Sequence, residues 1–297
     1  MAMPETAARG PGQAAIAAIE RQRWLEPVAD RLQRMVVGAY RAGGRAGRTL
    51  RDVLHGTWLG HPLHPVLTDV PLGAWTAALV LDGMATAGAS RAADAVIGAG
   101  LAGAVGAAVT GLTDWQHTTG ADRRTGLAHG LLNVTAATLY AASLLLRRRG
   151  ARSAGRAVAG LGFVTAAGAA YLGGHLVYRR RLGVDHAPPA EAWPDFVRVL
   201  PEADLGEARP RRAEARGIPI VLVRRHGRIH ALAETCAHLG GPLAEGTVED
   251  TAIRCPWHGS RFALEDGRLL EGPSVYPQPC FEVRVSEGHV EVRATGR

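Results

Sequence analysis

The chain has 297 residues, which is enough for a membrane region and one soluble domain. Its formal net charge of +7 suits either nucleic acid or an anionic membrane surface. Arginines lie directly beside long apolar runs, at 147–149 and 179–181, and no nucleic-acid-binding motif is present. A lipid bilayer is therefore an expected partner and nucleic acid is not. Three cysteines are too few for a disulfide framework.

Residues 1–54 form a basic lead-in that is predicted to be partly helical. Between Gln13 and Tyr40 apolar residues recur at helical spacing, which indicates an amphipathic helix. A partly ordered basic segment is the alternative. Residues 41–48 are rich in glycine and arginine and are expected to be a flexible linker.

Four apolar runs of helical membrane-spanning length follow, within a predicted membrane domain at residues 55–184. A helix needs about 20 apolar residues to cross the hydrocarbon core. Short loops between the runs favour an antiparallel four-helix bundle. Asp69, Pro71 and Asp82 weaken the first run, so buried helices of a soluble protein are the competing interpretation. The predicted spans are 65–87, 93–113, 127–146 and 157–177.

The arginines near these runs predict the orientation of the domain. Nine lie on the side of the chain termini (41, 45, 48, 51, 123, 124 and 179–181) and six on the other side (91, 147–149, 152 and 156). Cytoplasmic loops of membrane proteins carry the excess of basic residues. We therefore expect both termini, and the domain after the fourth span, on the cytoplasmic side of a bacterial inner membrane.

Three histidines lie near the ends of the predicted spans, and polar side chains in a bilayer point to function. They are His64, His129 and His175, with Asn133 one helical turn after His129. The speculative interpretation is that these histidines bind a haem b or a quinone headgroup. Hydrogen bonding between helices is the structural alternative.

Several motifs of this region resemble a bacterial family of four-helix membrane proteins with no known function. The resemblance covers about residues 55–185 and supports the fold without supplying an activity. The motifs are Gly60-His61-Pro62-Leu63-His64-Pro65, Gly111-Leu112-Thr113-Asp114-Trp115, His129 with Asn133, and Tyr171-Leu172-Gly173-Gly174-His175-Leu176-Val177-Tyr178.

Beyond the spans the chain changes character. Residues 185–194 are predicted to be a Pro-rich linker, and residues 195–297 show the short alternating runs of a small antiparallel all-β domain. The expected fold is thus multi-domain, with a transmembrane four-helix bundle followed by a β domain.

Two metal-ligand motifs lie in the β domain. The first is Cys236-Ala237-His238 and the second is Cys255-Pro256-Trp257-His258. With their flanking Gly-Gly-Pro and Gly-Ser sequences they resemble the Rieske ferredoxin family. The resemblance implies a [2Fe–2S] cluster in which Cys236 and Cys255 hold one iron and His238 and His258 the other. A structural zinc ion on the same four side chains is the alternative.

The resemblance also assigns supporting residues. Leu239 is expected to shield the cluster, Gly240 to let the backbone wrap closely around it, Ser260 to donate to a bridging sulfide, and Pro273 to lie in the loop that covers it. The family's high-potential branch has cysteines where this chain has Gly241 and Trp257, and a tyrosine in place of Phe262. We therefore expect a potential in the lower part of the range of about −150 to +300 mV.

These observations predict a membrane-anchored Rieske protein that transfers one electron at a time to a redox partner protein or the membrane quinone pool. A ferredoxin component of a separate oxygenase or reductase system and a membrane redox sensor without turnover are the alternatives. Too few residues follow His258 for the mononuclear iron domain of an oxygenase. No catalytic residue is therefore assigned.

Overall fold

The computed structural model describes residues 10–84, 86–188 and 191–296. The chain forms two compact units, one comprising the chain up to Gly44 together with His64–Arg181, the other Arg45–Leu63 together with Leu182–Arg297. We call them the helical unit and the β unit. This division differs from the expected boundaries, because residues 45–63 group with the β domain.

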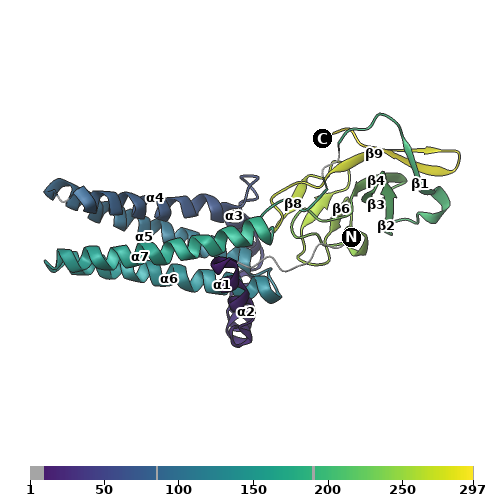
Figure 1. Ribbon diagram of the computed structural model, residues 1–297. Helices are drawn as coiled ribbons and strands as arrows, with labels where there is room; N and C mark the ends of the chain where they lie inside the picture. Colours follow the sequence, from purple (N-terminus) through teal and green to yellow (C-terminus); the bar gives the residue numbers. More distant parts are fainter. Residues whose placement is uncertain (1–9, 85, 189–190, 297) are drawn as a thin grey trace. The chain divides into compact units, whose positions relative to one another are not determined.

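Helices dominate the first part of the chain (Figure 1). They are α1 (Pro11–Glu20), α2 (Glu26–Ala42), α3 (Gly44–His55), α4 (Leu63–Met84), α5 (Ala87–Trp115), α6 (Gly120–Arg148) and α7 (Arg152–Gly174), with short turns η1 (Arg23–Leu25) and η2 (His175–Arg179). The expected class, helices followed by an antiparallel β domain, is confirmed. The described residues form seven α-helices: α4 to α7 correspond to the four predicted spans, and α1 to α3 belong mostly to the lead-in, which the sequence predicts to be partly helical.

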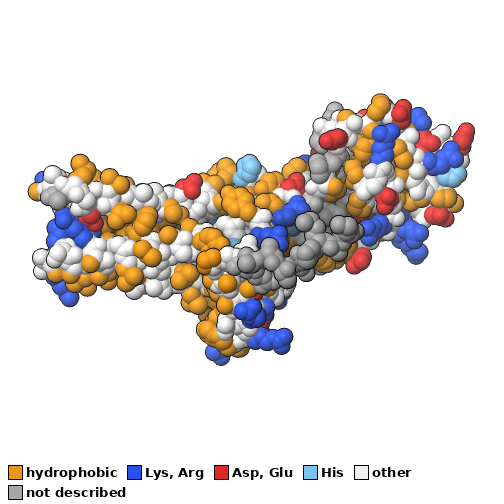
Figure 2. All heavy atoms as spheres, in the orientation of Figure 1, with side chains coloured by type: hydrophobic (Ala, Val, Ile, Leu, Met, Phe, Trp, Pro, Cys, Tyr) orange, Lys and Arg blue, Asp and Glu red, His pale blue; other side chains and the backbone are white. Residues whose placement is uncertain are grey.

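Three of these helices are long and apolar enough to cross a membrane. They are Ala87–Trp115, Gly120–Arg148 and the continuous stretch Arg152–Arg179. Among the described residues α4 does not reach this standard, since it carries Asp69, Pro71 and Asp82. Three of the four predicted spans are therefore confirmed as helices of sufficient length and apolar character, and the first predicted span is not. Their outer surfaces carry many hydrophobic side chains (Figure 2), which suits contact with lipid.

The lead-in packs onto the helical unit. Leu25 and Ala29 are buried against Trp115 and Leu127. The single helix predicted from Gln13 to Tyr40 is divided at η1, because Pro27 has no backbone N–H and fits only the first turn of a helix. The described part of the lead-in is thus ordered helix, while residues 1–9 lie outside the described residues.

Close packing joins α4 to α5 and α6 to α7. A Cβ placed at Gly103 would lie 2.5 Å from Val70, and one at Gly162 would lie 3.1 Å from Tyr140. Trp75 stacks on Tyr140 with ring centroids 4.2 Å apart. Small residues allow helix backbones to approach in this way.

The β unit contains two antiparallel sheets. The order of the larger is β1-β10-β9-β4-β3-β2 and that of the smaller is β5-β6-β7-β8. The strands are β1 (Val197–Pro201), β2 (Arg211–Ala215), β3 (Ile218–Arg225), β4 (Arg228–Ala233), β5 (Thr247–Glu249), β6 (Ala252–Arg254), β7 (Arg261–Ala263), β8 (Leu269–Glu271), β9 (Cys280–Ser286) and β10 (His289–Arg293), with turns η3 (Glu202–Asp204) and η4 (Leu243–Glu245).

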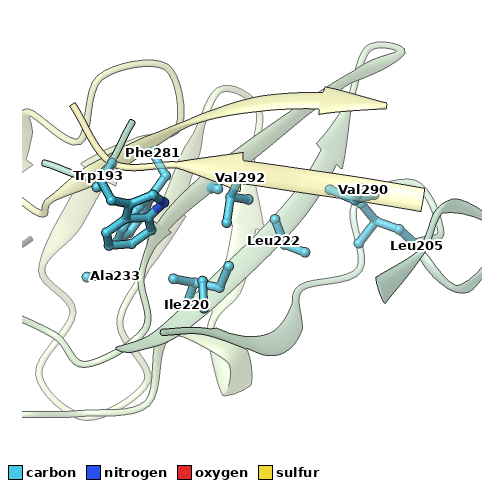
Figure 3. Close-up of a cluster of buried hydrophobic side chains, with 11 residues drawn as sticks. Trp193, Leu205, Ile220, Leu222, Ala233, Phe281, Val290 and Val292 are labelled. Atoms are coloured by element: carbon cyan, nitrogen blue, oxygen red, sulfur yellow. The ribbon is translucent and has the colours of Figure 1, made fainter. Parts of the chain in front are cut away.

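One face of the larger sheet builds a core around Trp193, Ile220, Leu222 and Phe281 (Figure 3). Trp193 belongs to the predicted linker, yet its backbone N–H donates to Ala294 O over 3.1 Å. The linker is therefore packed into the β unit at this end, while residues 189–190 lie outside the described residues.

Candidate metal centre

Two loops of the same construction carry the predicted ligands. In the first, Cys236 N donates to Gly241 O and Cys236 O accepts from Gly240 N, each over 2.9 Å. In the second, Cys255 N donates to Ser260 O over 2.9 Å and Cys255 O accepts from Gly259 N over 3.1 Å. Gly240 and Gly259 have φ values of +77° and +83°, which favour glycine. The first loop follows β4 and the second connects β6 to β7.

The four donor side chains meet as two pairs. The thiols of Cys236 and Cys255 are hydrogen-bonded to each other. The rings of His238 and His258 lie edge to face with centroids 5.1 Å apart. A Cβ at Gly241 would lie only 2.8 Å from Cys255 Sγ, so only glycine lets the first loop come this close to the second cysteine. The structure therefore brings together all four residues that the sequence singles out.

The protonation states suit metal binding. The hydrogen bond from the Cys236 thiol lowers the pKa of Cys255 to about 7, while the same contact and burial raise the pKa of Cys236. Burial lowers the pKa of His238 and of His258, so both imidazoles are neutral near pH 7. Metals bind neutral imidazole and thiolate. Two sulfur donors beside two neutral imidazoles match the donor set of a [2Fe–2S] cluster with mixed ligands.

The predicted supporting residues surround this centre. Ser260 is fully buried, and its Oγ accepts from Ser274 N over 2.9 Å, so its own hydrogen is directed elsewhere. Pro273 is buried next to Ser274, and the Gly272–Pro273 peptide is cis. Leu239 and Gly240 are half-buried in the first loop. Their roles toward the cluster stay predictions.

Gln278 is a supporting residue that sequence reasoning missed. Its Nε2 donates to Ala233 O and Thr235 O, both over 2.7 Å, and its Oε1 accepts from Ala237 N over 3.0 Å. The side chain is almost fully buried. It thus fastens the first ligand loop to the strand before it. In the sequence, the only local feature that marks Gln278 is its position between Pro277 and Pro279.

Residues 45–63, which we call the cap segment, pack beside the centre within the β unit. Arg51 lies 3.7 Å from Glu271 Oε1, and a Cβ at Gly272 would lie 3.0 Å from Thr57. The ring of His61 lies 6.1 Å from that of Tyr276. His55 is only 2% exposed, and its proximity contributes to the lowered pKa of His238.

The three predicted membrane histidines separate into a pair and a single residue. The rings of His64 and His129 lie 6.2 Å apart at 90°. His175 instead has its Nε2 3.6 Å from Glu20 Oε1, on α1. The structure therefore places His64 next to His129, and His175 beside Glu20 instead.

Comparison with known proteins divides the chain in the same way. A model of the Rieske [2Fe-2S] domain matches residues 195–282, and a model described as a predicted membrane protein (DUF2231) matches residues 60–186. Ferredoxin CarAc of Metapseudomonas resinovorans is 33% identical over 98 residues, which cover 33% of this chain and 92% of the ferredoxin. The ferredoxin component of biphenyl 2,3-dioxygenase from Rhodococcus jostii is 27% identical over 34% of this chain and 94% of its own length.

Human apoptosis-inducing factor 3 is 31% identical over 41% of this chain, but the match covers only 20% of that protein. Among solved structures, the ferredoxin of carbazole 1,9a-dioxygenase from Nocardioides aromaticivorans is 25% identical, with a TM-score of 0.33 over 34% of this chain and all of that one. The chain belongs to the Rieske [2Fe–2S] family through its β unit. Residues 195–282 thus form a Rieske [2Fe–2S] domain, and residues 60–186 match a predicted membrane protein.

Ser260 provides a test of the surroundings of the cluster. Replacing Ser260 with alanine is expected to lower the reduction potential, because a hydroxyl donating to sulfide stabilises the more negative reduced state. A hydrogen bond of about 1 kcal/mol corresponds to about 40 mV for one electron. Potentiometric titration followed by EPR measures the shift. Ser274→Ala is the control, since Ser274 offers Ser260 only its backbone N–H. Equal potentials in both variants and the parent would contradict the assignment.

Proposed function

We propose that Cys236 and Cys255 bind one iron of the cluster and His238 and His258 the other. The observation that carries this assignment is the meeting of two thiols and two neutral imidazoles, as pairs, on two loops of equal construction. The bound cluster supplies one-electron transfer at a potential that its two histidines raise above that of an all-cysteine cluster. Gly241 and Gln278 hold the two loops in register for this role.

The redox partner is a protein or the membrane quinone pool. One ferredoxin relative is by name a component of biphenyl 2,3-dioxygenase, which supports a protein partner. Trp257 gives such a partner an apolar contact beside the centre, since it is 56% exposed and its ring lies 6.3 Å from that of His258. Aromatic side chains of this kind anchor interfaces. The cap segment occupies another part of the surroundings of the centre and is followed in the chain by α4.

The membrane domain is an anchor in a bacterial inner membrane, with the β unit in the cytoplasm. The excess of arginine on the side of the termini supports this orientation. Three apolar helices and the matched family support residence in the bilayer. The fourth span of the proposal is α4. Its Asp82 lies near the C-terminal end of the helix and is paired with Arg147, whereas Asp69 is exposed.

Redox exchange in lipid vesicles tests this function. The full-length protein is reduced with dithionite, and reoxidation is followed by the visible absorbance of the cluster after addition of a quinone or an oxidised Rieske-type ferredoxin. We expect a one-electron midpoint and reoxidation within seconds by at least one acceptor, slowed for the ferredoxin by Trp257→Ala. A cluster that titrates but exchanges with neither acceptor over many minutes would favour the redox sensor instead.

A further inference from the structure

Two histidines of the helical unit occupy equivalent places in two successive helix pairs. His64 on α4 has its Nδ1 2.8 Å from Ala107 O on α5. His129 on α6 has its Nδ1 2.8 Å from Ala169 O on α7. In each pair the first helix supplies the imidazole and the second supplies a backbone carbonyl. The same contact between a histidine Nδ1 and a backbone carbonyl therefore occurs twice in the helical unit.

A glycine lies against each ring, four residues after the carbonyl. A Cβ at Gly111 would lie 2.8 Å from His64 Cε1, and one at Gly173 would lie 3.1 Å from His129 Cε1. Any larger residue would push the imidazole away from its helix pair. The two glycines therefore leave space for the imidazole rings between the helices. A histidine that only pointed outward as a polar residue would not need this space.

The contacts determine which nitrogen carries the hydrogen. A backbone carbonyl only accepts, so Nδ1 is protonated in both neutral rings and each Nε2 keeps its in-plane lone pair. Asn133 Nδ2 is 3.2 Å from Nε2 and 3.5 Å from Nδ1 of His129, so it lies over the face of the ring rather than on the axis of either lone pair. A histidine held by a carbonyl on one nitrogen is oriented to bind metal with the other.

The separation of the rings fits one metal ion between them. Their centroids are 6.2 Å apart and their planes are perpendicular. A metal–nitrogen bond is about 2.0–2.1 Å long, and the radius of the imidazole ring follows from ring bonds of about 1.33 Å. Two imidazoles on opposite sides of one metal ion therefore have ring centroids about 6.3 Å apart. We propose that His64 and His129 bind one transition-metal ion through their Nε2 atoms, on opposite sides of the ion.

Two trans imidazoles complete only certain metal centres. A haem iron has four nitrogens of its own and takes two axial ligands, and copper(I) is satisfied by two soft or borderline donors. Haem iron and copper(I) would each be a redox metal with two imidazole ligands. They are distinguished by the absorption spectrum and by the metal that is found. The proposal does not depend on the function of the cluster, because it rests only on residues of the helical unit.

Metal analysis of the full-length protein in detergent tests the proposal. We expect about one metal per chain beyond the two cluster irons, either as haem seen by its reduced absorption bands or as copper seen by mass spectrometry. The protein is measured as isolated and after incubation with haemin or with copper(I). His64→Ala and His129→Ala should each lower the additional metal at least tenfold and leave the EPR signal of the cluster unchanged. His175→Ala is the matched control and should keep the metal.

Two further variants separate binding from structure. His64→Asn and His129→Asn place a side-chain amide N–H where Nδ1 lies in the histidine and can donate to the same carbonyl, so they should fold like the parent and still lack the additional metal. Added imidazole should restore binding to His129→Ala. The proposal is overturned if the parent holds only the two cluster irons after both incubations. It is equally overturned if the asparagine variants keep the additional metal.

Discussion

Replacing Cys255 with serine is expected to remove the iron–sulfur cluster altogether. The thiolate is the form that binds iron, and the hydrogen bond from Cys236 lowers the pKa of Cys255 to about 7, so a thiolate is accessible at neutral pH. A serine hydroxyl does not ionise there. Iron content should fall from about two atoms per chain to less than a tenth of that, and the visible absorbance and EPR signal should disappear. Because metal binding contributes to folding, the melting temperature of the β unit should fall as well.

Cys280→Ser is the matched control for this change. Cys280 begins β9, pairs in register with Leu232 and lies outside both ligand loops. This variant removes a thiol of the same domain and should keep the iron and the EPR signal. A Cys255→Ser protein that retained two irons, or a parent protein that carried zinc in place of iron, would contradict the assignment of the site.

Replacing Arg147 with methionine is expected to destabilise the helical unit by about 3–5 kcal/mol. The Arg147 side chain is fully buried and its NH1 donates to Asp82 over 2.8 Å and to Asp94 over 3.1 Å. Its Nε donates to Ser143, whose own hydroxyl donates to Gly155 O. One guanidinium thus connects four helices, α4 to α7. Without it, Asp82 would remain buried with its charge incompletely paired. Thermal unfolding in detergent, followed by helical circular dichroism, measures the loss.

Arg149→Met tests whether charge or position matters. Arg149 belongs to the same run of three arginines but is exposed, so its loss should change the unfolding free energy by no more than about 0.5 kcal/mol. The double variant Arg147→Met with Asp82→Leu should recover part of the stability, because it removes both charges. Equal effects of the Arg147 and Arg149 replacements would show that the buried network does not stabilise the bundle.

Much of this protein could be predicted from local sequence. The two cysteine–histidine motifs predict the metal centre because ligand, glycine and turn lie within a few residues of one another, and the structure brings all four donors together. Apolar runs of about 20 residues predict helices for a membrane, and three of the four expected spans have the apolar length required. The change to alternating short runs predicts the antiparallel β domain that is observed.

Tertiary structure alone decided the contacts between distant segments. Gln278 fastens a loop that lies more than forty residues earlier in the chain. The cap segment belongs to the β unit rather than to the helices that follow it. Arg147 is the buried partner of Asp82 instead of a basic residue at a membrane surface. His64 and His129 form a pair, whereas His175 pairs with Glu20. Local periodicity carries the signal for helices, strands and turns. Which polar side chains meet depends on the packing of whole elements, and no spacing along the chain encodes it.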